Sequence, residues 1–170
     1  MDIIVNDTNI FIDLQSVGLL GAMCELPFEI HTLDLVVAEL TDPTQRADVD
    51  EYISRHKIKV HSLSSSELVA VAVEQSSVPG NLSFQDVAVC RYARSGAYKL
   101  LTGDRQLRNY AEKQNMEVHG IIYLIDEMVA DAIITPKEGA AKLRELLAVN
   151  VRLPKSEIAS RIEKWEKMID

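Results

Sequence analysis

The sequence contains few of the residues that define several specialised protein classes. Its 170 residues include two cysteines, Cys24 and Cys90, together with seven glycines and five prolines. Two thiols are too few for a disulfide framework or a cysteine-rich zinc site, and we expect both to be reduced in a cytoplasmic protein. The glycine and proline content excludes collagen-like and low-complexity chains. What remains is an ordinary globular protein, whose length is typical of one domain.

Long apolar runs and nucleotide-binding glycine motifs are also missing. No stretch approaches the roughly 20 apolar residues that cross a membrane, and residues 1–7 begin with an acidic rather than a basic region. We therefore expect neither membrane insertion nor secretion. The sequence has no P-loop, no dinucleotide-binding glycine pattern and no nucleophile-elbow serine, which argues against the nucleotide-binding enzymes and serine hydrolases that use those motifs.

Positive charge is scarce at the start of the chain. Residues 1–50 contain ten acidic residues and a single basic one, Arg46, and the formal net charge of the whole chain is −8. A net negative field repels phosphate, so the protein as a whole is not a general nucleic-acid-binding protein. Any activity on nucleic acid therefore needs local basic residues or bound cations.

Short apolar runs alternate with helical patterns along the chain. This alternation predicts an α/β sandwich with a mostly parallel sheet. We expect strands at residues 3–5, 28–32, 58–62, 98–102 and 117–119. We expect helices at residues 8–24 with a break near Gly18, 33–40, 43–55, 66–75, 83–96, 104–115, 122–132, 136–149 and 155–169. The last helix carries an amphipathic stripe, which predicts core packing or a docking surface, formed by Ile158, Ile162, Trp165 and Ile169.

Two acidic residues directly follow predicted strands. Asp7 comes after the strand at residues 3–5, and Asp104 comes after the strand at residues 98–102. In a parallel sheet the functional crevice lies beyond the carboxyl ends of the strands, so both side chains can converge there. A structural role as helix N-caps explains them equally well when each is considered alone.

Two further acidic residues lie on predicted helices. Asp86 is the third residue after Ser83, which suits a capping box, and Glu39 borders the apolar face of its helix. Clustered carboxylates repel one another unless they take up protons or bind a hard cation. Mg²⁺ or Mn²⁺ on such oxygen ligands suits the hydrolysis of a phosphodiester.

Four segments of the sequence resemble the motifs of PIN-domain nucleases and occur in the same order. The first resembles the family's opening aspartate motif, the second its helical glutamate, the third its next aspartate and the fourth its Thr-x-Asp. These segments are VNDTNIFID at 5–13, VVAEL at 36–40, SFQDVA at 83–88 and LLTGDRQL at 100–107.

The resemblance implies a Rossmann-like three-layer α/β/α sandwich at residues 1–135. The helical patterns that follow predict a C-terminal helical extension at residues 136–170 packed on the same domain. The implied activity is Mg²⁺- or Mn²⁺-dependent endoribonuclease cleavage of single-stranded RNA, as in the toxins of bacterial toxin–antitoxin pairs. It also implies an antitoxin protein and a second copy of the chain as partners. The implied metal ligands and catalytic residues are Asp7, Glu39, Asp86 and Asp104, with Asn9 and Thr102 supporting them.

The densest basic stretch flanks two of these acidic residues, and its arginines suit binding of RNA phosphates. A solvated helix face is an equally good explanation. The arginines are Arg91, Arg94, Arg105 and Arg108. Two other functions stay open: a non-catalytic PIN-like module that binds RNA or protein, with the acidic residues serving only as caps, and a structure-specific DNA nuclease.

Overall fold

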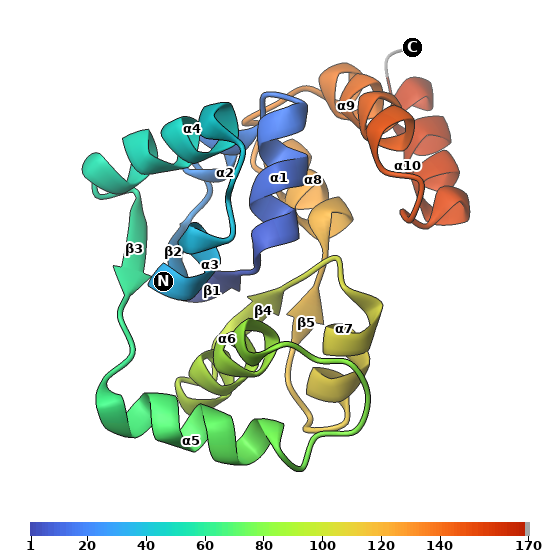
Figure 1. Ribbon diagram of the computed structural model, residues 1–170. Helices are drawn as coiled ribbons and strands as arrows, with labels where there is room; N and C mark the ends of the chain where they lie inside the picture. The colour runs from blue at the N-terminus through green and yellow to red at the C-terminus, as the bar shows by residue number, and fades with distance from the viewer. Residues whose placement is uncertain (169–170) are drawn as a thin grey trace.

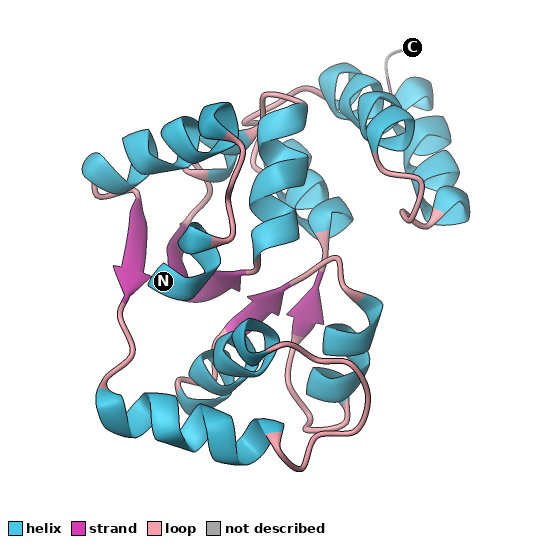
Figure 2. Cartoon of the chain, in the orientation of Figure 1, coloured by secondary structure: helices cyan, strands magenta, loops and turns pink. Residues whose placement is uncertain are grey.

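The computed structural model describes residues 1–168 as a parallel sheet with helices on both faces (Figures 1 and 2). All strand pairs are parallel, and the order in the sheet is β3-β2-β1-β4-β5. The predicted α/β sandwich is therefore confirmed. The strands are β1 (Asp2–Asn6), β2 (Phe28–Leu33), β3 (Ile58–His61), β4 (Lys99–Leu101) and β5 (Val118–His119).

The helices form two layers around the sheet. Figure 1 shows α5, α6 and α7 on one face, α1, α2, α4 and α8 on the other, and α9 and α10 as an outer pair beside α8. Their bounds are α1 (Thr8–Ser16), α2 (Leu20–Met23), α3 (Asp34–Ala38), α4 (Pro43–Ser54), α5 (Ser65–Gln75), α6 (Phe84–Ser95), α7 (Arg105–Glu112), α8 (Ile121–Ala130), α9 (Pro136–Val149) and α10 (Lys155–Lys167).

The two central strands are apolar because helices cover both of their faces. Ile4 and Val5 of β1 and Leu100 and Leu101 of β4 are completely buried. A strand buried on both sides has a continuous apolar run instead of an alternating one. This is why the short runs in the sequence identify the centre of the sheet.

The helix predicted at residues 33–40 is shorter than expected. Leu33 pairs with His61 at the end of β2, so α3 begins one residue later than predicted. The helix also ends earlier, at Ala38, and Glu39 is its C-cap. The predicted break between α1 and α2 is present at Gly18, which has a φ of +71°. Such a φ is accessible to glycine at little cost.

The C-terminal helices bury apolar side chains in the same hydrophobic cluster as the sheet. Ala140 and Leu143 of α9 and Ile158 and Trp165 of α10 are members of it. Ile169, the last residue of the predicted stripe, lies outside the described residues, and the domain boundary at residue 135 stays a prediction. No helix within residues 1–168 is long and apolar enough to cross a membrane.

Candidate active site

The strand order creates a crevice between the ends of β1 and β4. The chain continues from β1 to β2 and β3 on one side, and later returns to place β4 and β5 on the other side. The loops after β1 and β4 therefore diverge, which is the topological position at which open α/β sheets bind ligands. Asp7 follows β1 here, and Thr102, Gly103 and Asp104 follow β4.

Asp7 is the buried centre of this crevice, with 5% of its surface exposed. Its Oδ1 accepts a hydrogen bond from the Thr8 amide at 2.8 Å, and its Oδ2 accepts one from the Thr102 hydroxyl at 2.9 Å. Burial nevertheless raises the pKa of Asp7 to about 6, and the charges of Asp86 and Glu39 contribute to this increase.

Glu39 and Asp86 are close enough to each other and to Asp7 to repel electrostatically. Burial and the charge of Asp86 raise the pKa of Glu39, whose Oε1 accepts a hydrogen bond from the Thr8 hydroxyl at 3.2 Å. Asp86 also forms a capping box with Ser83, with bonds of 2.9 and 3.0 Å. Asp86 therefore caps α6 and adds negative charge to the crevice.

Asp104 is connected to Asp7 through the side chain of Thr102. The Asp104 amide donates to the Thr102 hydroxyl at 3.0 Å, and that hydroxyl donates to Asp7. The Asp104 carboxylate caps α7 by accepting the Leu107 amide at 2.8 Å. Asn9 also fixes this loop, because its Oδ1 accepts the Gly103 amide at 2.8 Å.

The four carboxylates have the donor chemistry that a hard divalent cation requires. None of them forms an ion pair with a Lys, Arg or His within the described residues. Oxygen ligands with uncompensated negative charge suit Mg²⁺ and Mn²⁺. In residues 1–168, however, no group of three His, Cys, Asp or Glu side chains is arranged so that it could hold a metal ion.

The four arginines selected from the sequence lie in two different places. Arg91 and Arg94 of α6 form ion pairs with Glu74 of α5 at 3.1 and 2.7 Å. Their charges are therefore paired within the protein and do not support the predicted binding of RNA phosphates. These bonds hold the pKa of Glu74 near 2. Arg105 and Arg108 of α7, in contrast, line a groove that reaches the crevice.

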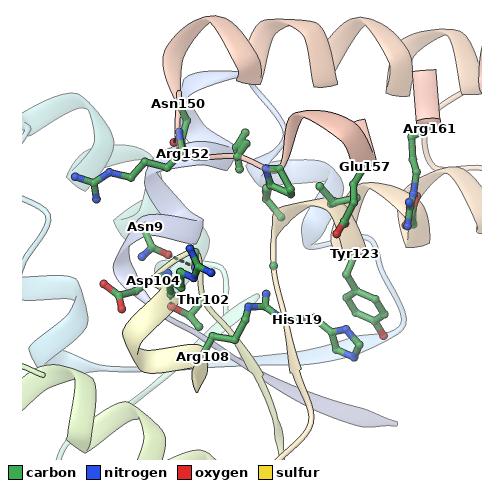
Figure 3. Close-up of a pocket in the computed structure, with 18 residues that line it drawn as sticks. Asn9, Thr102, Asp104, Arg108, His119, Tyr123, Asn150, Arg152, Glu157 and Arg161 are labelled. Carbon is green, nitrogen blue, oxygen red and sulfur yellow. Dashed lines mark hydrogen bonds and ion pairs between the residues drawn. The ribbon is translucent and has the colours of Figure 1, made fainter. Parts of the chain in front are cut away.

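This groove has a volume of about 700 Å³ and begins at Asn9, Thr102 and Asp104 (Figure 3). Several residues that line other parts of the groove could not be predicted from the sequence. No local motif marks them, because β5, α8 and the α9–α10 connection come together only in the folded chain. They are His119, Tyr123, Arg152 and Arg161.

The strand order and the acidic crevice define a Rossmann-like α/β protein with the three-layer architecture of PIN domains. A family model described as a PIN domain (DUF3368) matches residues 3–167. The chain therefore belongs to the PIN-domain family, whose members are generally nucleases and typically use divalent metals.

One solved structure illustrates the likeness of the fold. The crystal structure of PAE2754 from Pyrobaculum aerophilum has a TM-score of 0.52 and 18% sequence identity, and the match covers 76% of this chain and 96% of that chain. At this level of identity the likeness shows the fold alone. No curated protein sequence matches this chain.

Proposed function

We propose that this chain is an endoribonuclease that uses Mg²⁺ or Mn²⁺ to hydrolyse phosphodiester bonds of single-stranded RNA. The observation that carries the proposal is the buried Asp7 carboxylate, which is coupled to Glu39 and Asp86 and hydrogen-bonded to Thr102. It has no basic partner within the described residues and lies beside a groove with arginines in its walls. Its uncompensated negative charge supports a cation site, and the groove supports a phosphate-bearing ligand.

The residues of the crevice divide the proposed chemistry among them. Asp7 and Asp104 would hold the principal metal, and Glu39 and Asp86 would complete the site or orient the attacking water. A bound divalent cation supplies an activated water and neutralises charge on the phosphate. Thr102 keeps the Asp7 carboxylate in place through its 2.9 Å bond, and Asn9 fixes the loop that carries Asp104.

The test is RNA cleavage in Mn²⁺ by the wild-type chain and by Asp7→Asn. We expect the substitution to lower the rate about 100-fold or more, because it removes a charged ligand with little change of shape. Asp48→Asn is the matched control, since it makes the same chemical change at a half-buried aspartate whose partner is Gln15. Equal rates for wild type and Asp7→Asn overturn the proposal.

A non-catalytic module is the second candidate, because Asp86 and Asp104 both cap helices. A metal that binds the native state must raise the melting temperature. We expect millimolar Mn²⁺ to do so for wild type and to have a smaller effect on Asp7→Asn. A melting temperature that Mn²⁺ leaves unchanged, together with no cleavage, favours the non-catalytic module. Parallel assays on single-stranded RNA and flapped DNA distinguish the ribonuclease from a DNA nuclease.

We further propose that the protein acts in the cytoplasm as the toxin of a toxin–antitoxin pair and forms a homodimer. Induced expression in bacteria should then arrest growth, and Asp7→Asn should remove the arrest. Co-expression with the neighbouring reading frame tests for an antitoxin, and light scattering tests for the dimer. Normal growth during expression of active enzyme contradicts the toxin role without affecting the proposed chemistry.

A further inference from the structure

The C-terminal extension supplies one wall of the groove. The connection between α9 and α10, which we call the 150–154 loop, lines the groove together with the first turn of α7. Figure 3 shows Arg152 at the same end of the groove as Asn9 and Asp104, with Arg161 and Tyr123 toward the other end. The groove thus combines residues from both parts of the chain.

The arginines of the groove differ in whether they are already neutralised. Arg161 forms a two-nitrogen pair with Asp126, and Arg108 lies 3.6 Å from Glu112. Arg105 and Arg152 are exposed and pair with no carboxylate among residues 1–168. In a chain with a net charge of −8, two uncompensated guanidinium groups that line the same groove make a local site for anions.

The 150–154 loop is anchored to the helix that begins after Asp7. Asn150 donates from its side-chain amide to both carboxylate oxygens of Asp13 on α1, at 3.2 Å each. The side-chain oxygen of Asn150 accepts the Arg152 amide at 3.0 Å. Because α1 connects Asp7 to Asp13, the backbone of Arg152 is fixed relative to the acidic crevice. Asn150 is therefore a positioning residue for the loop.

We propose that the 150–154 loop is a substrate-binding arm, in which the Arg152 guanidinium binds a phosphate of an RNA strand that runs through the groove to the crevice. This inference rests on the proposed function, because it takes the same RNA as the ligand. Arg105, which lines the same groove, binds the strand as well. The rings of His119 and Tyr123 are stacked, with their centroids 3.8 Å apart. They offer a base a stacking surface, which favours RNA over an acidic peptide.

The experiment measures binding of a labelled ten-nucleotide oligouridylate by fluorescence anisotropy, with the full chain carrying Asp7→Asn as the uncleaving reference. Adding Arg152→Ala should weaken binding roughly tenfold. It should also make the slope of log affinity against log salt shallower by about 0.7, the value for one phosphate of a single strand. Lys137→Ala is the control, because it removes one exposed positive charge from α9 outside the groove, and it should change neither quantity.

Two further variants separate phosphate binding from disruption of the loop. Arg152→Lys keeps the charge and should retain most of the salt slope, whereas Asn150→Ala should weaken binding without changing the slope as much. Arg152→Ala binding that equals Lys137→Ala binding overturns the proposal. So does an Arg152 effect on a labelled decaglutamate peptide but not on the oligouridylate, which identifies a protein partner instead.

Failure of the arm and failure of the nuclease give different results. RNA cleavage that depends on Asp7, combined with RNA binding that is independent of Arg152, overturns the arm alone. Binding that depends on Arg152, with no cleavage by the wild-type chain in Mn²⁺, overturns the nuclease and leaves the arm as an RNA-binding surface.

Discussion

The Asp7 carboxylate loses more hydration on folding than its hydrogen bonds replace. Thr8, Asn9 and Thr102 all donate to it, yet burial raises its pKa from 3.8 to about 6. Burial penalises the charged form of a carboxylate, and protonation or a bound cation offsets that penalty. At neutral pH the metal-free protein therefore keeps a destabilising charge at the place where the proposed chemistry needs one.

This cost predicts a pH-dependent effect of Asp7→Asn on stability in EDTA. Because the pKa of Asp7 is higher in the folded state than in the unfolded state, its contribution is most favourable below pH 3.8 and is lost as the pH rises to about 6. Two pKa units correspond to about 3 kcal/mol. We therefore compare the free energy of unfolding of Asp7→Asn with that of wild type by urea unfolding. The difference should shift in favour of the variant by about 1–3 kcal/mol between pH 4.5 and pH 7.5. An equal stability difference at both pH values contradicts this account.

The elements of secondary structure could be predicted wherever the physical signal is local. The apolar runs of β1 and β4 identify the buried strands, and Ser83 and Asp104 occupy the N-cap positions that their side-chain chemistry suits. The end of β2 could not be predicted from the helical pattern around Glu39, because it depends on pairing with β3. Pairing between strands that are distant in the sequence overrides local preference.

The contacts between α5, α6 and α7 predict that Glu74 stabilises the protein. The side chain of Glu74 is 15% exposed. Its carboxylate pairs with Arg91 and Arg94 and accepts a hydrogen bond from Tyr110 at 2.7 Å. Arg94 contributes most to lowering the pKa of Glu74 from 4.5 to about 2. This contribution to stability is present above pH 4.5 and is lost as the pH falls toward 2.

We expect Glu74→Gln to lower the free energy of unfolding by about 1–3 kcal/mol at pH 7, because the two arginines lose a partly buried partner. The difference from wild type should shrink as the pH falls below 4.5. Glu51→Gln is the control, since its pair with Arg55 is well exposed and should contribute little. Urea unfolding from pH 3 to pH 7 measures both. A Glu74 effect no larger than that of Glu51 contradicts this interpretation.

At the scale of the whole molecule, the topology determines which parts of the site are visible in the sequence. Asp7 and Asp104 could be placed together because the carboxyl ends of parallel strands share one edge of the sheet. The groove could not be predicted, because Asn150 and Asp13 meet only when the extension packs on the first helix. The pairing of Arg91 with Glu74 could not be predicted either, because α5 and α6 come together only in the folded chain.

Packing of the extension on the main hydrophobic cluster predicts that the whole chain unfolds in a single step. The only tryptophan of the sequence, Trp165, is buried in α10, so its fluorescence reports on the extension while far-UV circular dichroism reports on all helices. In urea both signals should change at the same midpoint.

Leu143→Ala makes this test sharper, since Leu143 is fully buried on α9 and its truncation should cost about 2–5 kcal/mol. In one cooperative unit the substitution lowers both midpoints equally. If residues 136–170 form an independent unit, only the fluorescence midpoint moves, and most of the circular dichroism change stays at its original urea concentration. Such a result contradicts a shared core. In that case the 150–154 loop unfolds while the sheet that carries Asp7 stays folded, and the groove opens without unfolding of the crevice.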